Sequence, residues 1–347
     1  MSLAIDCPMP KLDFDVITLG HGSGGILTNK LLDSGVFNLF ENDILDQRHD
    51  GAFLDLNGKI AFSTDSFVVS PIFFPGGNIG SLSVHGTVND LAMCGAIPKY
   101  LAVSFILEEG LKMEEFWEIL VSMKVAAENA GVKIVTGDTK VVERGKGDKI
   151  FINTTGIGDI HKEANIDLRR IKPGDQIIIS GEMAHHGMAI MSVREGLEFE
   201  TDILSDSADL HNLTLDLIES FGDKIKLLRD PTRGGVATVL AEIAEQSNLG
   251  IAVSEGSFPN NEQVLSACEM LGLDPLYVAN EGLFIAIVVP SVSQECLKLL
   301  AQHESGKNAA IIGEIINDHL GKTVLRNAYG GSRVLHMLPG EQLPRIC

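Results

Sequence analysis

The sequence lacks the features of a membrane, secreted or disulfide-stabilised protein. No stretch approaches the roughly 18 consecutive apolar residues that span a bilayer, and the start, MSLAIDCPMP, has no basic segment followed by an apolar run. The five cysteines, among them Cys7 and Cys347, are odd in number and form no CxxC pair, so neither a disulfide framework nor a zinc knuckle is indicated. We therefore expect a cytoplasmic protein with reduced thiols.

Positive charge is also scarce. Lys and Arg number 27 against 47 Asp and Glu, which gives a formal net charge of −20. Because a basic patch is missing, we expect no nucleic-acid partner and no binding to an anionic membrane. An acidic protein that handles phosphate groups would have to do so through metal ions and backbone N–H groups.

Glycine, by contrast, is abundant. The chain has 36 glycines and only 12 prolines in 347 residues, a balance that indicates many close backbone approaches rather than disorder. The length indicates two domains of ordinary size, each able to bury a core of its own.

Hydrophobic periodicity predicts an α/β fold in two halves. The first half reads as strands over 59–70, 99–108, 133–142 and 149–160, with helices over 79–95 and 113–131. A charged segment with a Pro-Gly turn, 161–175, predicts a hinge. The second half begins with the strand QIIIS and continues with strands GIAVSE, LFIAIVV and AAIIGEI and with helices near 186–195, 208–221, 234–247, 261–272 and 293–304. From about Pro339 the chain is expected to be extended and mobile.

Five aspartates lie at strand ends or in glycine-rich turns. They are Asp50, Asp65, Asp90, Asp138 and Asp230. Carboxylates without a basic neighbour suit a hard cation such as Mg²⁺, which could bridge them to phosphate oxygens. Any one of them could equally be a turn residue or helix cap, but that alternative is weaker for all five together.

Two glycine clusters fit the same chemistry. GHGSGG, residues 20–25, precedes a helix and offers several N–H groups to a phosphate, although it is not a GxxxxGK(S/T) P-loop. DPTRGG puts Arg233 and two glycines at another helix start, where an anion could bind. The alternatives are a flexible loop in the first case and a water-facing arginine in the second.

Proton-transfer groups are harder to identify from spacing. Lys140 follows Asp138 by two residues, so a strand would place both side chains on one face. Glu281 lies in a turn that enters a buried strand. Both could transfer protons, and both could be solvated charges. The histidines show no metal-ligand spacing, so we assign none of them to a metal. The residues alone therefore predict a two-domain α/β enzyme that uses ATP and Mg²⁺ and ends in a mobile thiol.

At these same residues the sequence resembles a known family. The blocks GHGSGG, DSFVVSPIFFPGG, HGTVNDLAMCGA, TGDTKVV and RDPTRGG and the ending PRIC are similar to those of the HypE family, the carbamoyl dehydratases of nickel–iron hydrogenase maturation. The similarity runs in order from about residue 15 to 347. This family shares a superfamily with aminoimidazole ribonucleotide synthetase, selenophosphate synthetase and thiamine-monophosphate kinase.

The resemblance implies a specific activity. Cys347 would receive a carbamoyl group from the carbamoyltransferase HypF, and ATP would drive its dehydration to a thiocyanate. The HypC–HypD complex would take the product as the cyanide ligand of iron. The implied fold is α/β (α+β) and aminoimidazole-ribonucleotide-synthetase-like: an N-terminal ATP-binding and dimerisation domain (1–160) that forms a barrel with its homodimer mate, a C-terminal α/β domain (161–336) and a tail (337–347).

The resemblance also assigns roles to residues. Cys347, Lys140 and Glu281 would be catalytic. Mg²⁺ would be held by Asp50, Asp65, Asp90 and Asp230. ATP would be bound by Gly22, Ser23, Gly24, Gly25, Asn89, Asp138, Thr139 and Arg233.

Two other interpretations remain open. One is a kinase or synthetase of the same superfamily that acts on a free metabolite; a selenophosphate synthetase would carry a reactive Cys in its glycine-rich loop, and GHGSGG has none. The other is a scaffold that binds nucleotide without turnover and positions the tail for a partner protein.

Overall fold

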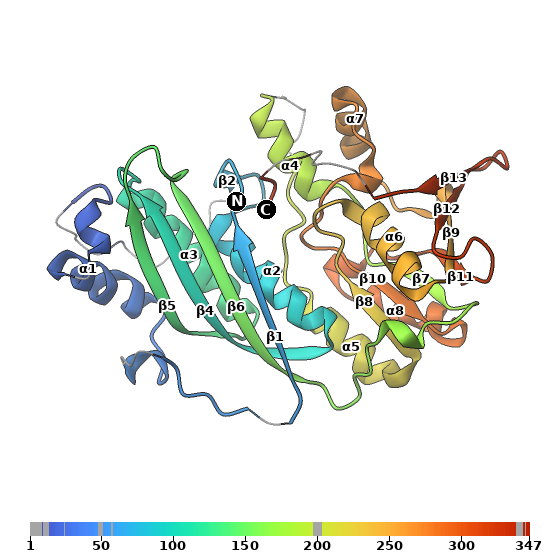
Figure 1. The fold of residues 1–347 in the computed structure, drawn as a ribbon, viewed down its shortest axis with the longest axis horizontal. Helices are drawn as coiled ribbons and strands as arrows, with labels where there is room; N and C mark the ends of the chain where they lie inside the picture. The colour runs from blue at the N-terminus through green and yellow to red at the C-terminus, as the bar shows by residue number, and fades with distance from the viewer. Residues whose placement is uncertain are drawn as a thin grey trace.

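The computed structural model describes residues 9, 14–23, 25–47, 51–56, 58–196, 203–337, 343 and 345–347. Two predicted site residues, Gly24 and Asp50, lie outside this range, as does Cys7. The described chain forms two large sheets, one before and one after the segment that joins Ile160 to Gln176, and one two-stranded hairpin (Figure 1).

The N-terminal sheet has four strands in the order β1-β6-β4-β5. Its strands β4 and β5 run parallel, while β6 is antiparallel to both β1 and β4. Two helices lie behind the sheet and cover one of its faces (Figure 1). These elements are β1 (Ile60–Phe67), α2 (Ile79–Met93), β4 (Ala96–Glu108), α3 (Met113–Asn129), β5 (Lys133–Val142) and β6 (Ile150–Ile160).

The opposite face of this sheet is open. Apolar side chains that alternate along the strands remain exposed there, including Ile60, Phe62 and Ile106 at 43, 65 and 44%. Both edge strands, β1 and β5, lack a second partner strand within the described residues. An apolar face and two free edges are unusual in an isolated domain, because such surfaces favour association.

Shorter elements flank the sheet. Helix α1 (Ile26–Leu31) continues as a π-helical turn, Leu32–Phe37, beside β5. The hairpin of β2 (Phe73–Phe74) and β3 (Gly77–Asn78) was not predicted, because strands of two residues have no readable periodicity.

The C-terminal sheet has seven strands within the described residues, in the order β13-β12-β9-β11-β7-β10-β8. The predicted strands are present as β7 (Gln176–Ile179), β9 (Gly250–Ser254), β10 (Ile285–Val288) and β11 (Ala310–Ile316); β8 (Ile225–Arg229), β12 (Thr323–Arg326) and β13 (Ser332–Leu335) were missed. The predicted helices are α4 (His185–Arg194), α5 (His211–Phe221), α6 (Gly235–Ser247), α7 (Glu262–Leu271) and α8 (Ser293–Leu300).

A large apolar cluster runs through both halves. It joins Phe67 and Leu82 of the first sheet and its helix to Ile177 and Ile285 of the second sheet. The two sheets are therefore packed against shared side chains, and the residues at their junction have fixed positions. None of the described helices is long and apolar enough to cross a bilayer.

Candidate functional site

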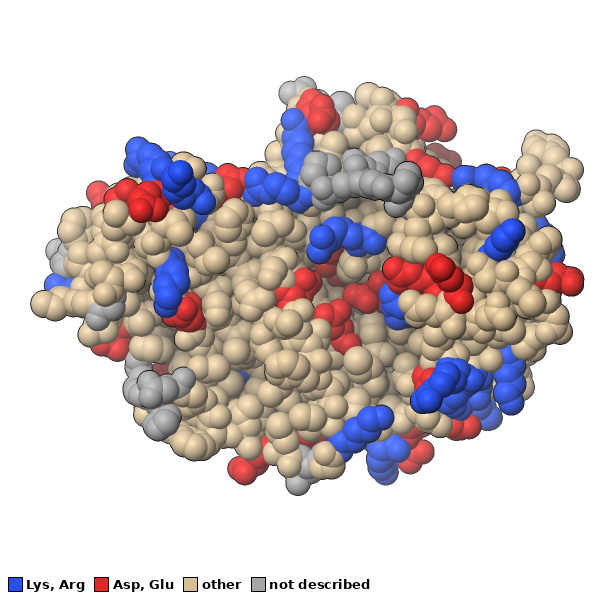
Figure 2. Space-filling model, in the orientation of Figure 1, with Lys and Arg blue, Asp and Glu red and all other residues tan. Residues whose placement is uncertain are grey.

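Four predicted acids gather where the two halves meet. Asp65 comes from β1, Asp90 from α2, Asp230 from the end of β8 and Glu281 from the turn before β10. Acidic side chains are visible in the hollow at the middle of the face in Figure 2. Residues separated by up to 216 positions are brought together because α2 packs between the first sheet and β8.

Burial and mutual repulsion perturb these carboxyls. Burial is the larger cause that raises the pKa of Asp90 to about 7, and Asp230 and Asp65 raise it further. The Ser63 hydroxyl donates a 2.6 Å hydrogen bond to Asp90 and partly opposes this rise. Burial also raises the pKa of Asp230. Several desolvated acids thus lie together, and burial favours the neutral form of each of them.

Glu281 is the most deeply buried of the group, at 4% exposure. Burial, followed by repulsion from Asp206 and Asp230, raises the pKa of Glu281 well above its usual value. Its backbone N–H donates to both carboxylate oxygens of Asp206, at 3.2 and 3.3 Å, and Gly282 N–H donates to one of them at 3.2 Å. Asp206 therefore fixes the turn that presents Glu281.

Asp206 was not predicted from the sequence. It lies in the segment 203–210, which has neither helix nor strand, and its partner lies 75 residues away. The aspartate was indistinguishable from an ordinary loop residue, because only the tertiary contact reveals its role.

The end of the chain is docked beside these acids. Val68 N–H donates to the main-chain oxygen of Cys347 at 3.1 Å, and Ser70 N–H donates to Arg345 O at 3.2 Å. Cys347 is only 8% exposed, and Ile346 is buried as well. We expected a mobile tail; in this structure its last three residues are held against the segment that follows β1.

The Cys347 thiol faces charged groups of both domains. Burial, with further contributions from Glu281 and Asp65, raises the pKa of Cys347 to about 12, while a hydrogen bond from Arg233 acts in the opposite direction. Burial raises the pKa of Asp65, and the charge of Arg233 partly opposes that rise. The sulfur, Glu281 and Arg233 thus form one site, which we call the tail site together with Asp65, Asp90 and Asp230.

The two glycines after Arg233 are required by the backbone. Gly234 and Gly235 have φ of +80° and +64°, a region that residues with a Cβ rarely adopt. A Cβ on Gly235 would lie 2.6 Å from Leu276 O. The RGG sequence therefore turns the chain sharply into α6 and leaves the Arg233 side chain exposed toward the tail site.

Arg345 holds the docked tail at some cost. Its Nε donates to Val68 O at 3.0 Å, its guanidinium forms an ion pair with Asp148, and it lies 5.9 Å from the centre of the Phe151 ring. Yet its backbone has φ of +55°, and its buried Nη2 has no hydrogen-bond partner among the residues that the structure describes. A left-handed residue and an unpaired buried donor each cost on the order of 1–3 kcal/mol, so these features oppose permanent docking.

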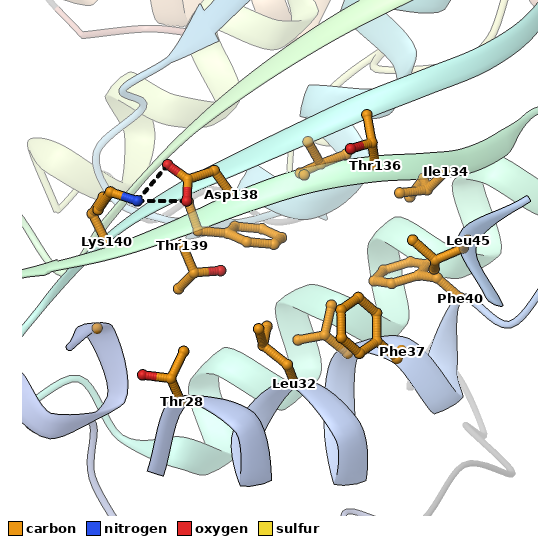
Figure 3. A pocket seen from close by; sticks show the side chains of 15 residues that line it. Thr28, Leu32, Phe37, Phe40, Leu45, Ile134, Thr136, Asp138, Thr139 and Lys140 are labelled. Carbon is orange, nitrogen blue, oxygen red and sulfur yellow. Dashed lines mark hydrogen bonds and ion pairs between the residues drawn. The ribbon is translucent and has the colours of Figure 1, made fainter. Parts of the chain in front are cut away.

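A second group of predicted residues lines a separate hollow. It lies between α1 with its π-helical turn and strand β5, and we call it the β5 hollow (Figure 3). Its lining includes Gly22, Thr28, Leu32, Phe37, Phe40, Leu45, Thr136, Asp138, Thr139 and Lys140. Gly22 is needed there, because a Cβ would lie 2.6 Å from Val141 N.

Polar and apolar groups are divided in this hollow. Thr139 points toward the apolar side chains of Leu32 and Phe37, whereas Asp138 and Lys140 lie on the other side of the strand (Figure 3). Lys140 Nζ donates to both Asp138 carboxylate oxygens, at 2.6 and 2.7 Å, and lowers the pKa of Asp138. The same-face placement of this pair was predicted and is confirmed.

The tail site and the β5 hollow lie at opposite edges of the N-terminal sheet. Phe67 of β1 and Thr139 of β5 share one row of the sheet, joined through Ile152 and Phe105. Three strand spacings separate them, roughly 14 Å. In addition, Lys140 pairs with Ile106 and shares the open face. One chain therefore does not bring Lys140 to its own Cys347.

Other predicted nucleotide residues have different surroundings. Asn89 is buried, donates to Ala208 O and Glu281 O at 3.0 and 3.3 Å, and accepts from Leu210 N–H at 2.8 Å. Both N–H groups of the Asn89 amide therefore bond to main-chain carbonyl oxygens, which indicates a structural role. Ser23 and Gly25 are exposed near the start of α1.

Protein ligands alone do not form a metal site among the residues that the structure describes. Within the described ranges, no three His, Cys, Asp or Glu side chains converge closely enough to hold an ion. The acids of the tail site nevertheless suit a cation, because burial and repulsion already raise the pKa of Asp90 and Asp230. Mg²⁺ commonly binds through one or two carboxylates and substrate phosphates, and this donor set fits that arrangement.

Comparisons with known proteins agree with this architecture. Residues 48–160 match the family described as AIR synthase related protein, N-terminal domain, and residues 172–326 match its C-terminal domain. The chain is 47% identical over 350 residues to the carbamoyl dehydratase HypE of Rhizobium leguminosarum bv. viciae, with 100% of each chain covered.

Solved structures give the same relationship. The chain matches a crystal structure of the hydrogenase maturation protein HypE in complex with ATP with a TM-score of 0.92 and 50% identity, over 95% of this chain and 99% of the other. It matches a chain of a HypE–HypF complex with a TM-score of 0.78 and 46% identity, over 90% and 100%. The chain therefore belongs to the HypE family of carbamoyl dehydratases.

Proposed function

We propose that this enzyme dehydrates a carbamoyl group carried on its own Cys347 to a thiocyanate, using ATP, and so supplies the cyanide ligand of a nickel–iron hydrogenase. The observation that carries the proposal is the docked Cys347 sulfur, which lies with Glu281 and Arg233 inside a cluster of buried acids. The 50% identical relative whose crystal structure contains ATP supports the nucleotide.

The reaction balances as a phosphorylation followed by an elimination. The amide oxygen of S-carbamoyl Cys347 attacks the γ-phosphorus of ATP, and ADP leaves. Breaking the C–O bond then releases phosphate with that oxygen, while the nitrogen loses both of its protons. One proton is carried by the phosphate and one is released to solvent. Phosphorylation is needed because an amide oxygen is otherwise a poor leaving group.

Glu281 is our candidate for the base that removes an N–H proton. It interacts electrostatically with the docked Cys347 thiol, and burial raises the pKa of Glu281 well above its usual value, which makes its carboxylate a stronger base. The Arg233 guanidinium, hydrogen-bonded to Cys347, would orient the carried group and bind developing negative charge. The low exposure of Cys347 would keep water from the activated intermediate.

Mg²⁺ would be held by Asp65, Asp90 and Asp230, with Asp50 as a further predicted ligand. The ion would neutralise charge on the phosphates when bound. Gly22, Thr139 and the other residues of the β5 hollow are our candidates for the nucleotide-binding surface, because the hollow offers apolar walls together with polar groups at its edge.

We propose that the enzyme works as a homodimer. Closing two four-stranded sheets into one barrel would remove the free edges by setting β1 of each copy beside β5 of the other. It would also cover the exposed Phe62 and Ile106. The β5 hollow and Lys140 of one copy would then lie next to the tail site of its partner, which resolves their separation within one chain.

Loading of Cys347 would take place away from the tail site. A thiol whose pKa is about 12 is protonated and weakly nucleophilic at neutral pH. The tail would therefore leave its docked position to accept the carbamoyl group from HypF, a proposal supported by the relative solved in a HypE–HypF complex. We further propose that the HypC–HypD complex accepts the product, and that these steps take place in the cytoplasm.

The intact mass of the Cys347 peptide tests this function. The protein is incubated with a HypF carbamoyltransferase and carbamoyl phosphate, with and without Mg-ATP. We expect a carbamoyl adduct that loses one water only when ATP is present. An unmodified tail, together with ATP-dependent phosphorylation of an added free metabolite, would favour a kinase of the same superfamily. ATP binding with a stable carbamoyl adduct and no water loss would favour the scaffold.

A further inference from the structure

His186 contacts the docked tail from inside the C-terminal domain. Its ring is fully buried in the first turn of α4. Nε2 lies 2.8 Å from the carbonyl oxygen of Ile346, the residue before Cys347, and Nδ1 lies 2.8 Å from Ser205 Oγ. The Phe74 ring packs edge-on against the imidazole, with ring centres 5.5 Å apart.

The chemistry of the neighbours fixes the tautomer. A carbonyl oxygen can only accept, so Nε2 carries the proton and donates it to Ile346 O. Nδ1 of a neutral ring then accepts from the Ser205 hydroxyl. Ser205 Oγ in turn accepts from Ser207 N–H at 3.0 Å. Burial lowers the pKa of His186, which favours this neutral form. The three hydrogen bonds are thus mutually consistent.

The same hydrogen-bonded segment presents the candidate base. Asp206 follows Ser205 directly and accepts the N–H groups of Glu281 and Gly282. Ser205 N–H donates to Pro75 O at 2.8 Å, which anchors the segment to the N-terminal half. The place of the Ile346 carbonyl and the place of Glu281 are therefore both set by residues 205–206.

We propose that His186 is a positioning residue that latches the tail: through Ile346 on one side and Ser205 on the other, it sets the Cys347 sulfur against Glu281. This inference rests on the proposed role of Cys347 as carrier. His186 does not touch the sulfur, and its hydrogen-bond chain ends at a carbonyl oxygen that has no proton to pass on. It therefore acts by geometry, and the latch determines how often the tail is docked.

Alkylation of Cys347 measures the latch directly. A docked thiol with a pKa of about 12 is nearly unreactive, so iodoacetamide reacts through the undocked state. The rate is read from the mass of the Cys347 peptide in the full-length protein without HypF, which separates this thiol from the others. His186→Ala is expected to raise the rate at least tenfold, and His186→Gln, which retains a terminal N–H donor, is expected to raise it less.

Three further variants locate the cause. Ser205→Ala removes the other hydrogen bond of the ring and is expected to speed alkylation even if His186→Ala folds poorly. His185→Ala is the matched control, because the neighbouring ring contacts Glu182 at 3.1 Å and not the tail; its rate should not change. Phe74→Leu removes the ring contact without altering the hydrogen bonds and is expected to have a smaller effect than His186→Ala.

Single-turnover dehydration provides the second readout. With carbamoylated protein, His186→Ala is expected to slow water loss at saturating ATP at least tenfold, with unchanged affinity for ATP. Unchanged alkylation in both His186→Ala and Ser205→Ala would overturn the latch, and so would equal acceleration by His185→Ala. If alkylation changes as expected but no carbamoyl adduct ever forms, the latch stands and the proposed carrier role of Cys347 fails.

Discussion

The tail site and the β5 hollow differ in almost every physical respect. The tail site is buried at the junction of the two halves, contains Glu281 and Asp90 with raised pKa values, and holds the chain's own Cys347. The β5 hollow lies at the far edge of one sheet, has largely apolar walls, and carries the exposed Lys140–Asp138 ion pair. The tail site has more acidic than basic residues, whereas the β5 hollow contains Lys140.

This difference is consistent with the homodimer proposed above, in which two copies would contribute different groups to one site. In the proposed function the tail site would supply the carried substrate and the base. The hollow offers apolar walls and polar edge groups but no thiol. Since β1 and β5 are the free edges of the same sheet within the described residues, a barrel made by two chains is the simplest assembly that joins the two regions.

Removal of the carrier should have the largest effect. Cys347→Ser keeps the shape of the tail but lacks a thiolate nucleophile, so we expect no carbamoyl adduct and no dehydration. ATP affinity should remain, because the β5 hollow does not include the tail. Peptide mass and calorimetric titration measure the two outcomes. Loss of ATP binding would mean instead that the tail is a structural part of the nucleotide site.

Glu281→Gln should have the second-largest effect on dehydration. The amide cannot accept a proton, so dehydration should slow by roughly 10²–10⁴-fold, while the carbamoyl adduct and ATP affinity persist. In the wild type, the activity should rise with pH as the carboxyl ionises above its usual range, because its pKa is raised. In a single-turnover pH profile of the variant, this rise in rate with pH should be absent. An unaltered rate would exclude Glu281 as the essential base.

Mixed dimers test whether the two regions cooperate across chains. Lys140→Ala and Cys347→Ser chains should each be inactive. Mixed one to one, they should recover roughly a quarter of wild-type activity, since half of the dimers are hybrids with one complete site. Lys140 forms only an exposed ion pair, so its replacement should cost less than about 1 kcal/mol of stability. If verified hybrids recover no activity, Lys140 does not contribute to the tail site of the other copy.

Asp90→Asn should have the smallest effect, which we expect in the stability of the folded protein. The pKa of Asp90 is raised from 3.8 to about 7, so the folded state binds the proton more tightly than the unfolded chain does. Wild-type stability therefore falls as the pH rises from about 4 to about 7. The variant lacks this loss and keeps an acceptor for the Ser63 hydroxyl.

Thermal unfolding measures this difference. The melting temperature of Asp90→Asn should match the wild type near pH 4 and exceed it by a few degrees at pH 8, at roughly 2–4 °C per kcal/mol. The same variant should bind Mg-ATP more weakly. A variant less stable than the wild type at pH 8 would contradict the charge conflict inferred for the acids.

Much of the fold could be predicted because its longer elements carry clear periodicity. The strand over 133–142 and the helix that begins at residue 113 were predicted within two residues of their bounds. Strands β8, β12 and β13 escaped, although β7, β9 and β10 are equally short, because Lys226, Arg326 and Arg333 interrupt or end their apolar runs. The proposed edge-to-edge arrangement of β1 and β5 between copies would leave no local signal in the sequence.

The site was predictable where residue chemistry is unusual. Acids in glycine-rich turns and a terminal thiol already indicate the tail site in the amino-acid sequence. Asp206 and His186 could not be found, since an ordinary aspartate and one of two adjacent histidines acquire their roles only from contacts 75 and 160 residues away. Nothing in the sequence indicates that the Asn89 amide donates to the loop around Ala208.

The most direct test of the account follows one oxygen atom. Cys347 is carbamoylated with carbamoyl phosphate labelled with oxygen-18 in the carbonyl, the excess reagent is removed, and Mg-ATP is added in unlabelled water. The account predicts that the tail loses its labelled oxygen and that the label is recovered in inorganic phosphate, one atom for each thiocyanate formed. Unlabelled phosphate, with the label still on the tail or in water, would contradict it, because ATP would then be hydrolysed without activating the amide.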